Sequence, residues 1–112
     1  MVANVDDEFR ISKERAEGLR SKFPEKYPVV VGRVGEGIEI QKRKYLASST
    51  STMGELMFSI RRYISLKKHE AMFLYVNSGL VPTNALVSDI WAKSNDGGCL
   101  YIELHKESTF GA

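Results

Sequence analysis

The segment KRKYLASSTSTMGELMFSIRRYI, which runs from Lys42 to Ile64, decides the fold because it joins a short strand to the clearest amphipathic helix of the chain. Thr52 and Glu55 have the spacing of a capping box, in which each side chain accepts a hydrogen bond from the other residue's backbone amide and a helix begins. An apolar stripe with helical spacing then follows: Met53, Leu56, Met57, Ile60 and Ile64. We expect a strand over 42–47 and a helix that starts at Thr52 and extends to about Ile64.

On the N-terminal side, the sequence predicts a helix followed by a strand. Residues 9–23 are rich in Arg, Lys and Glu, and apolar residues recur on one side of the expected helix: Phe9, Ala16, Leu19 and Phe23. Pro24 and Pro28 end this helix because proline lacks the backbone N–H and favours extended geometry in the preceding residue. A buried strand is expected to begin near Pro28, with three glycines after it as turn residues: Gly32, Gly35 and Gly37.

On the C-terminal side, two further strands and a short helix are expected. The composition of 72–76 favours a strand, 77–79 a turn and 87–93 a short helix. After a turn at 95–98, residues 99–105 alternate between apolar and polar side chains, as in a half-buried strand. The order helix, strand, strand, helix, strand, short helix, strand is α+β. It fits a ubiquitin-like β-grasp with an added N-terminal helix.

The chain has the size of one domain. Its 112 residues are 43% hydrophobic and 27% charged, which suits a single modest core. We divide it into a helical extension packed on the same domain (1–27), the β-grasp core (28–106) and a flexible C-terminal tail (107–112). A single cysteine, Cys99, excludes an intramolecular disulfide and is compatible with a reducing cytosol.

Composition excludes several classes of function. The apolar runs are far shorter than the ~20 residues that span a bilayer, and the acidic N-terminus lacks the features of a secretory signal. No nucleophile comes with an evident base, so no enzymatic activity is expected. The two histidines, His69 and His105, show no metal-site spacing and are expected to be solvated or hydrogen-bonded. We expect no metal and no cofactor, and Cys99 is better explained as a core or pocket residue than as a reactive thiol.

Basic clusters at 42–44, 61–62 and 67–68 leave two interpretations. The net charge of +2 is too small to indicate nucleic acid binding, so solvated faces are the plain explanation. The alternative is a peptide-binding strand: at a sheet edge, 42–46 would add an extended peptide as another strand, while Lys42 and Lys44 attract acidic residues of the ligand.

The chain resembles the autophagy-related eight family of ubiquitin-like modifiers, of the GABARAP and microtubule-associated-protein light chain three type. Blocks that match in order run from about Phe9 to Gly111. They are Glu17-Gly18, Lys22-Phe23-Pro24, Pro28-Val29-Val30, Lys42-Arg43-Lys44-Tyr45-Leu46, Gly54-x-Leu56-x-Phe58-x-Ile60-Arg61-Arg62, Ala71-x-Phe73, Val76-Asn77, Pro82-Thr83, Asp96-Gly97, Leu100-Tyr101 and Thr109-Phe110-Gly111.

The resemblance implies a modifier that is processed and joined to a lipid. A cysteine protease would cut after Gly111 and remove Ala112, and activating and conjugating enzymes would transfer the glycine carboxyl to phosphatidylethanolamine. The cytoplasmic protein would then be held on autophagosomal membranes by the lipid chains, at ~0.8 kcal/mol per buried CH₂. The alternatives are conjugation to another protein, or a divergent peptide-binding relative that is not lipidated. Taken alone, the terminal glycine would also fit an ordinary tail.

The resemblance also implies a groove for cargo receptors with aromatic-x-x-aliphatic motifs. The aromatic pocket would contain Leu19, Pro28, Val30, Lys44, Leu46 and Cys99. The aliphatic pocket would contain Tyr45, Ala47, Leu56, Ile60 and Tyr63. Acidic ligand residues would meet Lys26 and Lys42, and the processing and conjugation machinery would meet Phe73 and Tyr75. The plain alternative is that the apolar members are only core, and one of the two aromatic residues could be buried in the sheet.

Departures from the family pattern put the ligand preference in doubt. Arg15 stands where the family usually has an acidic residue, Tyr63 where it has arginine and Cys99 where it has phenylalanine. Ser48 and Ser59 replace residues that are usually apolar. Cysteine in place of phenylalanine would leave space below the aromatic pocket, which would favour tryptophan over smaller aromatic anchors.

Overall fold

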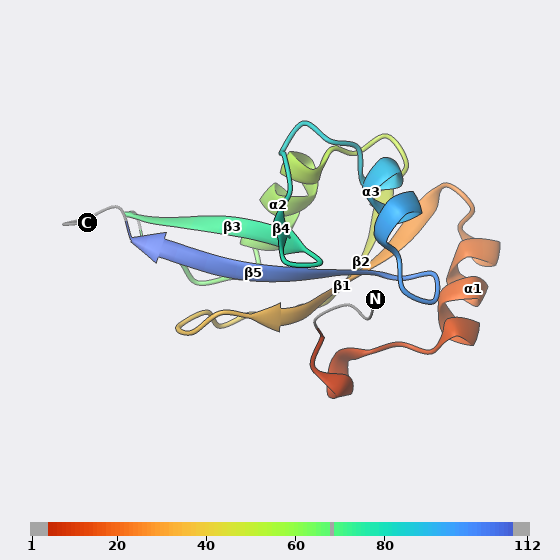
Figure 1. Ribbon diagram of the computed structural model, residues 1–112, viewed down its shortest axis with the longest axis horizontal. Coiled ribbons are helices and arrows are strands. Elements are labelled where there is room, and N and C mark those ends of the chain that lie inside the picture. Colours follow the sequence, from red (N-terminus) through yellow and green to blue (C-terminus); the bar gives the residue numbers. More distant parts are fainter. Residues whose placement is uncertain (1–4, 68, 109–112) are drawn as a thin grey trace.

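The structure is a computed structural model that describes residues 5–67 and 69–108. Its centre is a mixed five-stranded sheet in the order β2-β1-β5-β3-β4 (Figure 1), with the strands β1 (Lys26–Val34), β2 (Lys44–Ser48), β3 (Glu70–Val76), β4 (Gly79–Leu80) and β5 (Leu100–Ser108). The helices are the 3-10 turn η1 (Asp7–Phe9), α1 (Lys13–Lys22), α2 (Met53–Arg61) and α3 (Val87–Ser94). β1 runs parallel to β5 and antiparallel to β2, which confirms the predicted α+β class.

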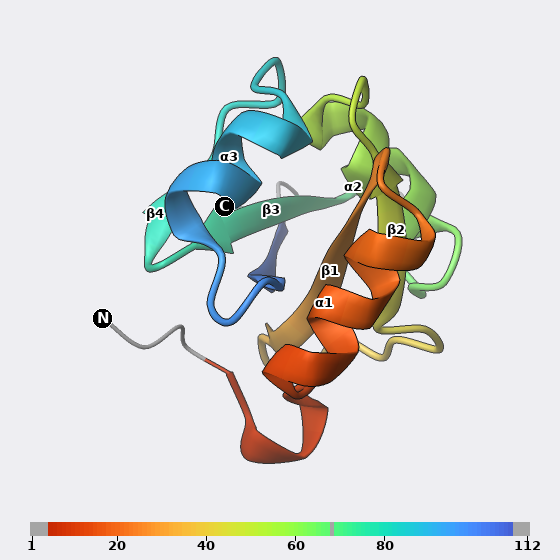
Figure 2. The ribbon, with the colours of Figure 1, turned by 90° about the vertical axis from the view of Figure 1, so that its right-hand side faces the viewer.

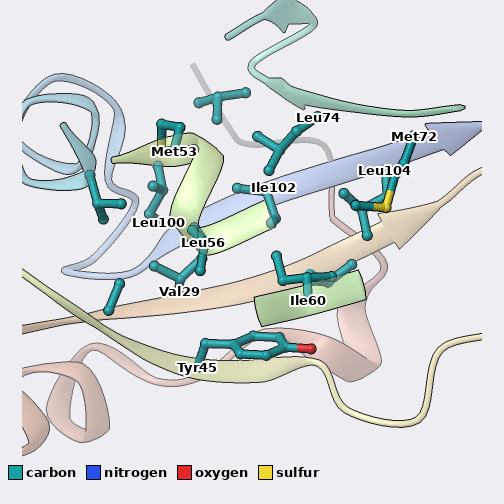
Figure 3. Close-up of a cluster of buried hydrophobic side chains, with 14 of the residues drawn as sticks. Val29, Tyr45, Met53, Leu56, Ile60, Met72, Leu74, Leu100, Ile102 and Leu104 are labelled. Atoms are coloured by element: carbon teal, nitrogen blue, oxygen red, sulfur yellow. The ribbon is translucent and has the colours of Figure 1, made fainter. Parts of the chain in front are cut away.

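The main core lies between the sheet and α2. Leu56 and Ile60 of α2 belong to one buried cluster with Val29 of β1 and Ile102 of β5 (Figure 3). Because strand side chains alternate between faces, Val30 points to the opposite side, where a smaller cluster also holds Ala16, Cys99 and Tyr101. The sheet is therefore buried on both faces at β1, which explains three consecutive valines there.

The helix α2 begins as the sequence predicts. Thr52 and Glu55 form the capping box, with the Glu55 amide donating to Thr52 Oγ1 at 3.1 Å and the Thr52 amide donating to Glu55 Oε1 at 3.0 Å. The helix ends at Arg61, earlier than its apolar stripe suggested. Ile64 lies beyond it and forms an isolated bridge with Ile40.

The N-terminal helix predicted over 9–23 forms only over 13–22, and the part before Lys13 is not continuous helix. The chain forms η1, a short extended segment and then α1, which Ser12 caps by accepting a hydrogen bond from the Arg15 amide at 3.1 Å. Residues 5–11, which we call the strap, cross the sheet face that carries the smaller cluster, on the same side as α1 (Figure 2). Apart from the hydrogen bonds of η1, contacts with the sheet hold this segment.

Gly32 was expected in a turn but lies inside β1. The strap passes directly over it: a Cβ built on Gly32 would lie 2.8 Å from both γ carbons of Val5, and the Asp6 amide donates to the Gly32 carbonyl at 3.1 Å. The turn itself follows the strand and contains Gly37, whose φ of +81° suits glycine.

Two details at the other end of the sheet also differ from expectation. Asn77 and Ser78, with φ of 50° and 68°, form a tight hairpin, and Gly79 already belongs to the short strand β4 that the sequence did not predict. β5 extends to Ser108, so residues 107–108 of the expected tail lie in the strand. Gly111 lies outside the described residues.

Candidate peptide-binding groove

The strand β2 lies at one edge of the sheet and pairs only with β1 among the described strands. Its side chains alternate: Tyr45 and Ala47 are buried against the core, while Lys44 and Leu46 are exposed. An edge strand offers backbone N–H and C=O groups to an added strand, and the exposed side chains next to it supply specificity. The structure thus places the predicted peptide-binding strand where an extended peptide can pair with it.

Beside β2, between α1 and the sheet, lies a first pocket of about 420 Å³. It brings together five of the six residues expected in an aromatic pocket. Its apolar lining comes from Ile11, Leu19, Pro28, Val29, Val30, Tyr45 and Leu46, and its cationic lining from Arg15, Lys42 and Lys44. An apolar floor with a cationic rim and no carboxylate suits an aromatic side chain that is flanked by acidic residues.

Cys99, the sixth residue expected there, does not line the first pocket. Its side chain is fully buried in the smaller cluster, below Val30 and next to Ala16 and Tyr101. Neighbouring side chains close around the sulfur, so the replaced phenylalanine leaves no space that opens into the pocket. The expected preference for tryptophan therefore has no basis in this geometry.

Burial changes the acid–base behaviour of Cys99. Desolvation raises the pKa of its thiol from 9.0 to about 12. The unfolded chain then releases this proton at lower pH than the folded chain, so the stability of the fold is fully present below about pH 9 and declines as pH rises toward 12. We expect Cys99→Ala to reduce the slope of the free energy of unfolding above pH 9 by up to about 1.4 kcal/mol per pH unit. Urea titrations of both forms between pH 8 and 10.5 measure it, and equal slopes would contradict the assignment.

A second pocket of about 890 Å³ lies on the other side of β2, against α2. It brings together four of the five residues expected in an aliphatic pocket: Tyr45, Ala47, Leu56 and Tyr63. Ile60 is not among them, because its side chain is fully buried in the main core. Lys26 and Lys42, the expected contacts for acidic ligand residues, both line this pocket.

Lys42 joins the two pockets. Its ammonium group lies 5.1 Å from the centroid of the Tyr45 ring and 5.2 Å from that of Tyr63, within cation–π range. Burial raises the pKa of Tyr45 to about 12, so its hydroxyl stays protonated and donates to the Lys42 carbonyl at 2.7 Å. Lys42 and Tyr45 line both pockets, so the two pockets meet at these residues.

Comparison with known proteins assigns the family. The model of the family described as "Autophagy protein Atg8 ubiquitin like" matches residues 11–111. The chain belongs to the Atg8 family.

Individual relatives agree with this assignment. The chain is 36% identical to autophagy-related protein 8e of Arabidopsis thaliana, over 99% of this chain and 93% of the relative, and 39% identical to autophagy-related protein 8 of Kluyveromyces lactis, over 99% and 94%. The crystal structure of Trypanosoma brucei ATG8 is similar, with a TM-score of 0.74 and 28% identity over 88% of each chain. Plasmodium falciparum Atg8, in complex with an Atg3 peptide, has a TM-score of 0.72 and 25% identity over 82% of this chain and 85% of that one. The ubiquitin-like fold and the prediction of a non-enzymatic protein are thereby confirmed.

Phe73 and Tyr75, expected to meet the processing and conjugation machinery, lie apart from both pockets of this Atg8 family protein. Their neighbours in β3, Met72, Leu74 and Val76, fill the main core, so alternation places Phe73 and Tyr75 together on the other face of the sheet. Both are half-buried, and Tyr75 packs edge-on against His105 with the ring centroids 5.3 Å apart. The alternative that one of them is buried in the sheet does not hold, because both side chains are partly exposed.

Several residues that line the two pockets were not predicted as such, among them Ile11, Arg15 and Phe58. Ile11 lines the first pocket from the strap, and Arg15, known only as a departure from the family pattern, lines it from α1. Phe58 lines the second pocket with 64% of its surface exposed. An exposed large aromatic residue in an amphipathic helix is the sequence signal that could have identified it. The polar replacements Ser48 and Ser59 also line the second pocket.

The search for metal sites and membrane-spanning helices covers the described residues alone. Within 5–67 and 69–108, no cluster of three or more potential metal ligands occurs. In the same two ranges, no helix has the length and apolar character needed to cross a membrane.

Proposed function

We propose that this Atg8 family protein is a lipid-conjugated modifier of autophagy that recruits partners through the groove at β2. A cysteine protease cuts after Gly111, and activating and conjugating enzymes join the Gly111 carboxyl to the amine of phosphatidylethanolamine. The lipid then holds the protein on autophagosomal membranes. The observation that carries this proposal is that the family match extends through Gly111. Glycine has no Cβ, so it passes through narrow enzyme active sites and leaves its carboxyl open to attack.

The groove supports the recruiting half of the proposal. An edge strand lies between two pockets, and the cations of both pockets suit acidic residues of the ligand: Arg15, Lys26, Lys42, Lys44 and Arg62. We propose that cargo receptors with aromatic-x-x-aliphatic motifs add here as a sixth strand. The relative from Plasmodium falciparum was solved with an Atg3 peptide, which supports both a peptide ligand and a conjugating enzyme as partner. Phe73 and Tyr75 are proposed to contact the processing and conjugation enzymes.

Intact mass spectrometry of the chain recovered from starved cells tests the proposal. The expected species ends at Gly111 and carries the mass of phosphatidylethanolamine. A protein adduct on Gly111 would favour a protein modifier instead. A chain that retains Ala112 and carries no adduct would favour a peptide-binding protein that is not conjugated.

A further inference from the structure

Ile11 is the one residue of the strap that lines the first pocket. The other lining residues belong to α1, β1 or β2 and their flanks, so regular secondary structure and the core fix their positions. Ile11 instead lies in the extended segment between η1 and α1, where no helical or strand hydrogen bond holds it. Its position must therefore come from elsewhere in the fold.

A single side chain from β5 holds both backbone groups of Ile11. The Tyr101 hydroxyl accepts a hydrogen bond from the Ile11 amide at 3.0 Å and lies 3.3 Å from the Ile11 carbonyl, to which it donates. The hydroxyl thus uses its donor and one of its acceptor sites on the same residue. The Tyr101 ring is buried in the smaller cluster, so the hydroxyl presents a fixed point to the strap.

A second contact, at the neighbouring residue Arg10, also holds the strap against the sheet. The Arg10 guanidinium forms an ion pair with Asp96 at 2.9 Å and lies 5.3 Å from the centroid of the Tyr101 ring. These three side chains do not line the first pocket. Arg10, Asp96 and Tyr101 therefore touch the chain beside and at Ile11 but are not placed to touch a ligand.

We propose that Ile11 contacts the aromatic side chain of the ligand and that Tyr101 is a positioning residue, which holds Ile11 as a wall of the first pocket. This inference rests on the proposed peptide-binding function and deepens it. A loosened strap would leave the wall mobile, and part of the apolar surface that the aromatic side chain buries would be lost. The loss should concern the aromatic position of the ligand and not the aliphatic one.

The test is a double-mutant cycle measured by calorimetry with an acidic aromatic-x-x-aliphatic peptide. Tyr101→Phe keeps the buried ring and removes both hydrogen bonds, so the affinity is expected to fall about fivefold. Ile11→Ala removes the wall itself and is expected to cost about fivefold or more. If Tyr101 acts through Ile11, Tyr101→Phe costs almost nothing more in the Ile11→Ala background.

Leu46→Ala is the matched control, because Leu46 lines the same pocket from β2 and does not depend on the strap. In that background, Tyr101→Phe should keep its full effect. A second peptide carries leucine at the aromatic position. The factor by which this replacement lowers the affinity should differ between the wild type and Tyr101→Phe, and equal factors would show that Tyr101 has no influence on the pocket.

The outcomes separate the inference from the proposed function. If the wild type binds and Tyr101→Phe binds equally well, or if its effect is the same with and without Ile11, the inference is wrong and the groove stands. If Tyr101→Phe lowers the stability in thermal unfolding and weakens the binding of every peptide to the same extent, Tyr101 is structural and not a positioning residue. A wild type that binds no motif peptide overturns the proposed groove, and this inference with it.

Discussion

Replacing Gly111 by alanine is expected to abolish both processing and membrane capture of this protein. The change adds one methyl group at the residue that a protease must accommodate and whose carboxyl must then be activated and attacked. Loss of more than nine tenths of the lipid adduct is the expected size of the effect, because conjugation uses this carboxyl alone. The measurement is intact mass and membrane flotation of the variant from starved cells. Normal adduct and normal flotation would contradict the modifier function.

A shortened chain is the matched control for the glycine substitution. Deleting Ala112 leaves Gly111 as the last residue and removes the need for the protease, so this form should be conjugated without processing. Gly111→Ala in the shortened chain should remain unconjugated. That pair separates a failure of cleavage from a failure of conjugation, since only the first is relieved by the deletion.

Features that are decided by local chemistry could be predicted from the sequence. The capping box of Thr52 and Glu55 involves residues three apart, so it could be found from the sequence, and α2 begins there. The edge position of β2 was only a condition of the peptide-binding interpretation, and the strand order of the structure meets it. The strand over 72–76 was also predicted from its composition, whereas the position of Phe73 and Tyr75 away from the core came from the resemblance and is seen in the alternating burial of β3.

Contacts between residues that are distant in the chain could not be predicted from the sequence. The helix expected over 9–23 begins only at Lys13. Before it, residues about 90 positions away contact the chain: the Tyr101 hydroxyl contacts Ile11 and the Asp96 carboxylate contacts Arg10. Such contacts have no signature in a local window. The same contacts bring Ile11 into the first pocket, so the error in the helix and the missed pocket residue have one cause.

Cys99 shows a different limit. The resemblance shows which family position Cys99 occupies. It does not show whether the smaller side chain leaves open space, because that depends on how the neighbouring side chains pack. In this chain the sulfur is fully enclosed by the smaller cluster, so the position below the first pocket is structural. Ile60 is similar: its side chain is fully buried in the main core, although Leu56, one turn earlier on the same side of α2, also lines the second pocket.

The combined substitution Lys44→Glu and Leu46→Ala is expected to lower the affinity for acidic aromatic-x-x-aliphatic peptides by tenfold or more. Both side chains line the first pocket and point outward from β2, so neither is needed for the main core. The first change replaces an attractive rim charge by a repulsive one, which lowers the association rate and its dependence on salt. The second removes apolar surface, at ~25 cal/mol per Å², from the wall that faces α1.

Calorimetry at two salt concentrations measures both parts. Lys44→Glu alone should lose most of its effect at high salt, whereas Leu46→Ala alone should keep its effect, because apolar burial is not screened. The matched control is Leu80→Ala, which truncates an exposed leucine of β4 at the opposite edge of the sheet and should leave the affinity unchanged. Lipid conjugation should survive in Lys44→Glu, in Leu46→Ala and in their combination, since these changes leave Gly111 and the face with Phe73 untouched. Unchanged affinity of the combined variant for peptides that the wild type binds would place the ligand elsewhere on the protein.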